Sequence, residues 1–215
     1  MENPVVIFGA GTLGKIALDI FNSNNVLVYG FLDENKELHN TEISDVMVLG
    51  SPDDDGFLKI IGNKTEAFVA IDHKRKKQKL VEMLNERRKT MPVNAVHPKA
   101  SVAEDSEIGH GNLIAARTFI GPGAKIKSHT VVHAGAIVDA FAEIGDFSEI
   151  GAGAIINTEV KIGEGVFVGS GAVIVSGIKV GKNARIGAGS VVIENVGDGE
   201  TVFGNPAVAI KAKKD

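Results

Sequence analysis

The feature that most constrains the fold of this chain is a six-residue repeat. From Val96 to Gly197 the sequence divides into 17 consecutive hexads without an insertion, and every hexad begins with Val or Ile. The fifth position is usually Ala, Ser, Thr or Val, and the second is often Gly. An α-helix repeats every 3.6 residues and a flat strand every two, so neither produces this period. The repeat predicts a coil of short strands and turns, in which each leading side chain points inward and stacks on its equivalent three hexads later.

The composition fits such a coil and excludes several functions. The 26 glycines among 215 residues supply the positive φ angles that tight corners need. A net charge of −4, from 23 Lys+Arg and 27 Asp+Glu, argues against a nucleic-acid partner. No apolar run is long enough to cross a membrane, and the first residues do not resemble a signal peptide, so we expect a cytoplasmic protein with no membrane partner. The absence of cysteine excludes disulfides and thiolate chemistry.

The residues before the repeat have an α/β pattern, and we predict that 1–91 form a Rossmann-like domain. An apolar strand, Val5–Phe8, is followed by a glycine turn and then by a helix with an apolar stripe. A second strand ends at Asp33, and a third spans 67–72. The segment after it is expected to be a helix that buries Leu80, Val81, Met83 and Leu84, with the basic run 74–79 as its solvated face.

The glycine turn has the form G-x-G-x-x-G, with Gly9, Gly11 and Gly14 between a strand and a helix. This motif directs backbone N–H groups and a helix N-terminus at a phosphate, and an acid such as Asp33 can accept hydrogen bonds from a ribose. Two alternatives remain open. The glycines could serve only a tight turn and close packing, or the ligand could be a nicotinamide dinucleotide, which the short domain and the following coil disfavour.

The hexad pattern resembles the hexapeptide-repeat family of transferases. The resemblance implies an all-β left-handed parallel β-helix, which we assign to residues 92–215 together with a C-terminal tail. It also implies a homotrimer, and acyl transfer as the usual activity, although some members are purely structural.

The two parts together are similar to bacterial sugar O-acyltransferases of the sialic acid O-acetyltransferase type, whose relatives N-acetylate UDP- or GDP-linked amino sugars. The markers are FGAGTLGK, FLDEN, AVHPKASV, IGAGSVV and FGNPAVAI. The resemblance implies transfer of an acetyl group from acetyl-CoA to an amino or hydroxyl group of a nucleotide-activated sugar in glycan biosynthesis, with no metal. It places the nucleotide at Gly9, Gly11, Thr12, Leu13, Gly14 and Asp33, and the acyl-CoA at Thr158, Ser176 and Gly177.

The chain departs from this family where the family keeps its catalytic base. In HAGAIVDAFAEIGDFSEI, Ala140 occupies the position of the family's base. Phe141 replaces the acid that follows the base in the family, and Glu149 replaces a downstream histidine. Thr158 stands where the family commonly has glycine. Deprotonation of an amine or hydroxyl needs a base, and His133, oriented by Asp139 or Glu149, is the candidate. His110 and His129 are expected at solvent-exposed turns. The alternative function is a catalytically impaired paralogue that binds nucleotide sugar or CoA as a scaffold or partner.

Overall fold

The computed structural model describes residues 3–210 and divides the chain into two units. The first unit ends at Pro98 and the second begins at Lys99, whereas the sequence predicted a division between residues 91 and 92. Residues after 91 still belong to the first unit, because the Val93 amide donates a hydrogen bond to the Ala67 carbonyl at 2.9 Å. The last five residues of the predicted second domain, 211–215, lie outside the described residues.

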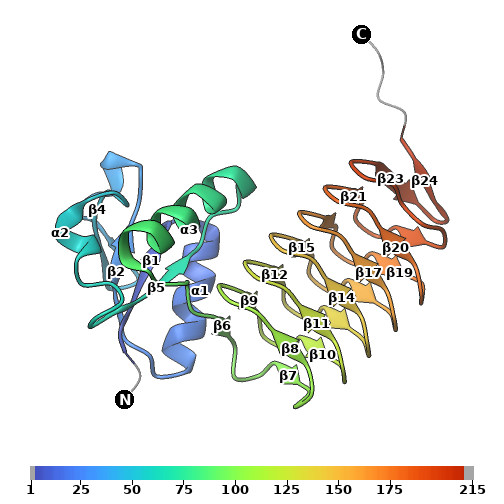
Figure 1. Ribbon diagram of the computed structural model, residues 1–215, viewed down its shortest axis with the longest axis horizontal. Helices are drawn as coiled ribbons and strands as arrows, with labels where there is room; N and C mark the ends of the chain where they lie inside the picture. The colour runs from blue at the N-terminus through green and yellow to red at the C-terminus, as the bar shows by residue number, and fades with distance from the viewer. Residues whose placement is uncertain (1–2, 211–215) are drawn as a thin grey trace, which may run out of the picture. The chain divides into compact units, whose positions relative to one another are not determined.

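The first unit is built on a five-stranded sheet of order β3-β4-β2-β1-β5 (Figure 1). Strands β5, β1, β2 and β4 run parallel to one another, and β3 is antiparallel to β4. The strands are β1 (Val5–Phe8), β2 (Val28–Leu32), β3 (Glu42–Ile43), β4 (Val46–Gly50) and β5 (Glu66–Val69), with β6 (Ala95–Val96) near the end of the unit. The helical segments are α1 (Thr12–Ser23), the 3-10 turn η1 (Lys36–Leu38), α2 (Asp55–Leu58) and α3 (Lys74–Arg88).

Apolar side chains of β1, β2 and β5 form one buried cluster of this unit, together with residues of α2 and α3. All four residues of β1 are buried, as expected of a central parallel strand. The predicted stripe of α3 is only partly correct. Val81 and Leu84 are buried, but Leu80 and Met83 are only half-buried, and Lys77 is buried in their place. A lysine can take this position because its methylene stem packs against apolar surface.

The second unit is a three-sided coil of two-residue strands, as the hexads predicted (Figure 1). Each side is a parallel sheet. The sheet that we call the apolar sheet contains β7 (Ser101–Val102), β10 (Phe119–Ile120), β13 (Ile137–Val138), β16 (Ile155–Ile156), β19 (Val173–Ile174) and β22 (Val191–Val192). The charged sheet contains β8 (Glu107–Ile108), β11 (Lys125–Ile126), β14 (Glu143–Ile144), β17 (Lys161–Ile162) and β20 (Lys179–Val180). The third sheet contains β9 (Leu113–Ile114), β12 (Val131–Val132), β15 (Glu149–Ile150), β18 (Phe167–Val168) and β21 (Arg185–Ile186), and then the terminal strands β23 (Thr201–Gly204) and β24 (Ala207–Ala209).

The leading residue of each hexad stacks on its equivalent one coil away. Ile120 pairs with Val138, and Val138 pairs with Ile156, which confirms the predicted stacking at every third hexad. These three side chains have no exposed surface. Small residues of the fifth position, such as Ala136 and Ala154, are also fully buried. The core is narrow, and aliphatic ladders with small residues at the corners fill it.

The corners depend on the fourth position of the hexad, where φ is positive. Glycine fills many of these positions, for example Gly135 at +70°. Non-glycine residues also adopt this conformation, including His129, Phe141 and Phe147. The expectation that His129 is exposed is wrong: its side chain is buried and stacks on Phe147 with ring centroids 4.9 Å apart. One coil separates the two residues, so their aromatic rings meet at the same corner. His110 is exposed, as expected.

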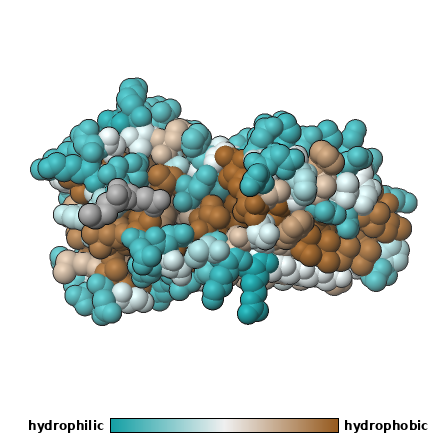
Figure 2. Space-filling model, turned by 90° about the horizontal axis from the view of Figure 1, so that it is seen from below, coloured by the Kyte–Doolittle hydropathy of each residue, from teal (hydrophilic) through white to brown (hydrophobic). Residues whose placement is uncertain are grey.

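The outward residues differ sharply between two of the three sheets. On the apolar sheet, five strands present Phe119, Ile137, Ile155, Val173 and Val191. On the charged sheet, the equivalent positions hold Glu107, Lys125, Glu143, Lys161 and Lys179. Figure 2 shows a band of hydrophobic residues along the solenoid on the face that is in view.

The solenoid closes with a short hairpin. Strand β23 continues the third sheet beside β21, and β24 returns antiparallel to it. The GNPA sequence forms the turn between the two strands. Within residues 3–210, no helix is both long enough and apolar enough to span a membrane.

Candidate functional site

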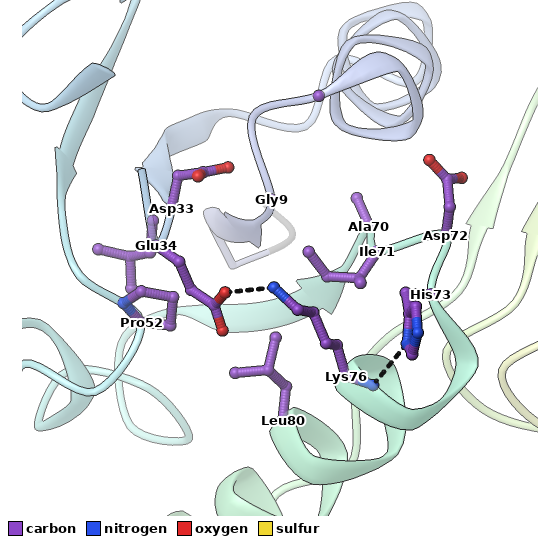
Figure 3. Close-up of a pocket in the computed structure, with 12 residues that line it drawn as sticks. Gly9, Asp33, Glu34, Pro52, Ala70, Ile71, Asp72, His73, Lys76 and Leu80 are labelled. Carbon is purple, nitrogen blue, oxygen red and sulfur yellow. Dashed lines mark hydrogen bonds and ion pairs between the residues drawn. The ribbon is translucent and has the colours of Figure 1, made fainter. Parts of the chain in front are cut away.

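The first unit contains a cavity of about 300 Å³ beside the carboxyl ends of its parallel strands (Figure 3). Ligands of open α/β sheets bind at this edge. The cavity is lined by the glycine turn after β1, by residues that follow β2 and β5, and by the first turns of α3. The lining residues are Gly9, Gly11, Leu32, Asp33, Glu34, Pro52, Ala70, Ile71, Asp72, His73, Lys76 and Leu80.

The three glycines of the motif have different roles. Gly9 has φ of +109°, and a Cβ there would lie 2.6 Å from the Ala70 carbonyl oxygen. A Cβ on Gly14 would lie 2.1 Å from the Gly9 carbonyl oxygen, so this glycine lets α1 approach the turn. Gly11 has an ordinary extended backbone, and a Cβ there would meet no atom within 4 Å. The turn and the packing therefore explain Gly9 and Gly14 but not Gly11, which lines the cavity.

Asp33 fixes the glycine turn from the end of β2. Its Oδ2 accepts a hydrogen bond from the Ala10 amide at 2.7 Å, and its Oδ1 accepts one from the Asn35 amide at 2.8 Å. Each carboxylate oxygen can accept a second bond. Asp33 can therefore hold the loop and still accept hydrogen bonds from a ligand hydroxyl in the cavity.

Glu34 and Lys76 form an ion pair in the cavity. Lys76 Nζ lies 2.7 Å from Glu34 Oε2, and Figure 3 shows the two side chains extending toward each other from the end of β2 and from α3. The hydrogen bond to Glu34 raises the pKa of Lys76, and the charge of Asp33 adds to this effect. The sequence pattern predicts Lys76 only as part of the solvated face of α3 and does not single out Glu34. The FLDEN segment contained the signal for Glu34, but only the fold brings it to α3.

Of the six residues predicted to bind the nucleotide, three line the cavity and three begin the helix beside it. Gly9, Gly11 and Asp33 line the cavity. Thr12, Leu13 and Gly14 are the first residues of α1, whose N-cap is Gly11. Because Gly11 has no side chain to cap them, the first amides of α1 are available to an anion that enters from the cavity.

Besides the charged sheet, the solenoid carries polar residues at its corners, and two of these corners border the apolar sheet. The first, which we call the His133 corner, lies between the third sheet and the apolar sheet and includes residues 133–136 and 151–154. His133 Nε2 lies 3.0 Å from Glu149 Oε1, which belongs to the next coil. Both side chains are partly exposed, at 23% and 34%. Of the two predicted orienting acids, the structure therefore pairs His133 with Glu149.

The second corner, the Ala140 corner, lies between the apolar and charged sheets and includes residues 139–142, 157–160 and 175–178. Ala140, Thr158 and Ser176 occupy equivalent positions in successive coils, linked by backbone bonds from Glu159 to Ala140 and from Gly177 to Thr158. Thr158 Oγ1 donates a hydrogen bond to Asp139 Oδ2 at 2.9 Å. Asp139 is therefore hydrogen-bonded to Thr158. Within one chain, Asp139 and His133 lie at different corners of the coil. Phe141 is 59% exposed at this corner.

These observations define the class of protein: an α/β unit with a glycine-turn cavity, followed by a hexapeptide solenoid with polar corners. No group of three or more metal-ligating side chains occurs within residues 3–210.

Comparisons with known families agree with this class. The PglD N-terminal domain family matches residues 4–84, and the bacterial transferase hexapeptide repeat matches residues 159–194. A comparison with curated protein sequences found no significant match.

Solved structures match over almost the whole chain. A histidine-to-alanine mutant of GDP-perosamine N-acetyltransferase from Caulobacter crescentus, in complex with CoA and GDP-perosamine, is 27% identical. It has a TM-score of 0.89, with 99% of each chain covered. The acetyltransferase domain of PglB from Neisseria gonorrhoeae, in complex with acetyl coenzyme A, is 24% identical. Its TM-score is 0.88, with 98% of this chain and 100% of that chain covered. These matches confirm the predicted fold class, a Rossmann-like domain followed by a left-handed β-helix. The chain is related to the hexapeptide-repeat acyltransferases.

Proposed function

We propose that this protein transfers an acyl group from acyl-CoA to the amino group of a nucleotide-activated sugar. The observation that carries the proposal is the glycine-turn cavity of the first unit. Gly11 lines this cavity, and neither backbone strain nor packing requires a glycine there. A ligand that approaches the backbone closely provides the reason, as a diphosphate does at a helix N-terminus.

The relatives supply the chemistry. The Caulobacter protein is an N-acetyltransferase recorded with both CoA and GDP-perosamine, a nucleotide sugar. Its likeness to this chain includes both units. We therefore place the nucleotide of the acceptor in the glycine-turn cavity and the acyl-CoA along the Ala140 corner, beside Thr158, Ser176 and Gly177.

The outward face of the apolar sheet supports a homotrimer. A continuous apolar face on a soluble protein marks an interface, and copies of the same chain are its simplest partner. Around a threefold axis, one edge of this face meets the opposite edge of the same face on the next copy. The two edges are the His133 corner and the Ala140 corner. In such a trimer, His133 of one copy lies beside Ala140 of its neighbour.

This arrangement gives the reaction a base. The carboxylate of Glu149 only accepts hydrogen bonds, so His133 donates Nε2–H to it and keeps a lone pair on Nδ1. Nδ1 takes the proton as the amine attacks the thioester carbonyl carbon. The C–N bond forms, the C–S bond breaks with its electron pair on sulfur, and the proton passes from His133 to the CoA thiolate.

A second function is favoured by Ala140 itself. The described residues of the Ala140 corner include no imidazole, so a chain without the relocated base would bind both ligands without turnover. In the Caulobacter relative, a histidine-to-alanine mutant is recorded with both ligands. Replacement of a histidine by alanine is thus compatible with ligand binding in that protein.

Subunit complementation tests the proposed site. We expect His133→Ala and Ser176→Trp each to lose turnover, the first for lack of a base and the second because the indole blocks the acyl-CoA path. Co-expression of the two variants in equal amounts should restore about a quarter of the wild-type activity, because a site shared between copies then receives both intact residues. A site within one chain gives no restoration. Absence of turnover in the wild-type protein, with activity gained only in Ala140→His, identifies the impaired paralogue.

The nucleotide cavity has its own test. The φ of Gly11 suits any residue, and there is open space for a Cβ, so Gly11→Asp should fold like the wild type. The added carboxylate repels a diphosphate, and we expect nucleoside diphosphate affinity to fall at least tenfold by calorimetry. Circular dichroism serves as the folding control. Unchanged affinity in a folded variant would refute the placement of the nucleotide.

A further inference from the structure

The polar residues of the cavity are arranged along its length in an order that suits a nucleotide. The glycine turn and the N-terminus of α1 offer N–H groups at one end. Asp33 follows, with its carboxylate bonded to the Ala10 amide of that turn. Glu34 is the next residue and pairs with Lys76. With the diphosphate at the turn and the ribose at Asp33, the base reaches the Glu34–Lys76 pair.

Apolar side chains accompany this pair. Pro52 and Leu80 line the same cavity, and Figure 3 shows them beside Glu34 and Lys76. Apolar walls with one polar edge are what a flat heterocyclic base requires, since its faces are apolar and its hydrogen-bonding groups lie on its rim.

We propose that the Glu34–Lys76 pair recognises the base of the bound nucleotide and selects guanine. This inference rests on the proposed function, because it assumes that the cavity holds a nucleotide. A carboxylate accepts two parallel N–H bonds, and guanine has two adjacent donors, N1–H and the N2 amine. Its O6 acceptor lies beside them, within reach of an ammonium group.

The existing contact leaves room for this recognition. The Glu34–Lys76 bond uses one of the three N–H donors of Lys76 and one lone pair of Glu34. A second donor of Lys76 can bind O6, while the two carboxylate oxygens accept from N1–H and the N2 amine. The raised pKa of Lys76 keeps it protonated at neutral pH.

Other bases fit the pair less well. Uracil and thymine have one N–H between two carbonyl oxygens, so one carboxylate oxygen of Glu34 would face an acceptor. Adenine and cytosine place an acceptor next to their amine. Each of these bases loses one of the two carboxylate bonds and gains a repulsive contact, whereas guanine matches all three groups.

Calorimetry with GDP, IDP, UDP and dTDP tests the inference on the wild-type protein. IDP is guanosine diphosphate without the N2 amine, so it isolates one of the two carboxylate bonds. We expect GDP to bind about tenfold or more tightly than UDP or dTDP, with IDP between them. Equal binding of GDP and UDP overturns base selection and leaves the nucleotide site intact. If none of the four nucleotides binds, the proposed nucleotide site fails, and the inference fails with it.

Glu34→Gln provides the matched variant, because glutamine keeps the shape but turns one acceptor into a donor. We expect it to lose the preference for GDP over IDP and to reduce the preference over UDP to within about threefold. UDP affinity itself should not fall, because the glutamine amide can donate to the uracil carbonyl oxygen that the carboxylate repels, and the glycine turn and Asp33 are intact. Glu86→Gln removes an exposed charge from α3 and should keep the wild-type order. A GDP preference that survives Glu34→Gln would overturn the role of Glu34.

Discussion

The apolar and charged sheets of the solenoid share the same two-residue strands and the same parallel pairing, yet they differ in what they present to the outside. Ile156, the inward residue of β16 on the apolar sheet, and Ile144, the inward residue of β14 on the charged sheet, are both fully buried. Their outward neighbours are Ile155 and Glu143. The inward residues therefore determine that the chain forms a coil. The outward residues determine separately what each face of the coil can contact.

On the charged sheet, the outward residues neutralise one another along the ladder. Lys125 pairs with Glu107 at 2.8 Å and Lys161 pairs with Glu143 at 2.9 Å. Charged side chains on a flat sheet also prevent edge and face association. On the apolar sheet, the outward residues of β10, β13, β16, β19 and β22 are aliphatic or aromatic and have no charged partner to hold them at a water-exposed surface, which is why we propose that face as the interface of a trimer.

The largest expected effect is on assembly. Ile155→Glu places a charge at the centre of the apolar sheet, where each interface of a trimer would bury it without a partner. We expect the variant to sediment as a monomer and to lose turnover. Lys161→Glu changes the outward residue of β17, which is the next strand in the chain and belongs to the charged sheet, and it should leave the trimer and the activity intact. A trimer that persists in Ile155→Glu would exclude this face as the interface.

Truncation of a buried side chain should lower the stability by a similar amount beneath the apolar sheet and beneath the charged sheet. Ile156→Ala and Ile144→Ala each remove a buried side chain from an inward ladder, and each should cost about 2–5 kcal/mol of stability. Denaturant titration of both variants measures the two losses. If Ile156→Ala proved far more costly than Ile144→Ala, the inward ladder and the outward face would not be independent, contrary to the comparison.

Breaking an ion pair on the charged sheet should have a small effect. Glu143→Gln removes the carboxylate that pairs with Lys161 at the surface, and exposed pairs contribute roughly 0.2–1 kcal/mol. Thermal unfolding in low and high salt provides the measurement, because added salt should reduce the difference between variant and wild type. A loss as large as that of a core variant would contradict the role given to this face.

The smallest effect concerns pH. The hydrogen bond from Lys125 lowers the pKa of Glu107 below its usual range. A depressed carboxyl pKa contributes stability above the unfolded pKa and loses it as the pH falls through the folded pKa. The contribution of this exposed pair should therefore disappear on acidification below the normal titration range of glutamate. Thermal unfolding of wild type and Glu107→Gln should differ slightly at neutral pH and converge in acid; a gap that persists in acid would assign the difference to another cause.

Much of the fold was predictable because its signals are local and repeated. The hexads fixed the strand positions, and each leading residue from Ile114 to Val192 is buried as expected. The helix α3 was placed correctly, but its buried face was not, because the packing of Lys77 depends on distant residues. The burial of His129 was missed for a similar reason: its partner, Phe147, lies one coil away.

The sequence by itself determined the inward ladder of the coil, the glycine turn and the acid at the end of β2, since each depends on neighbouring residues or on a strict period. Only the tertiary structure decided which polar groups meet. Glu34 and Lys76 are separated by 42 residues along the chain, and His133 meets Glu149 rather than Asp139 because the coil sets residues of successive turns side by side. Such contacts follow from the three-dimensional path of the backbone, and no local pattern encodes them.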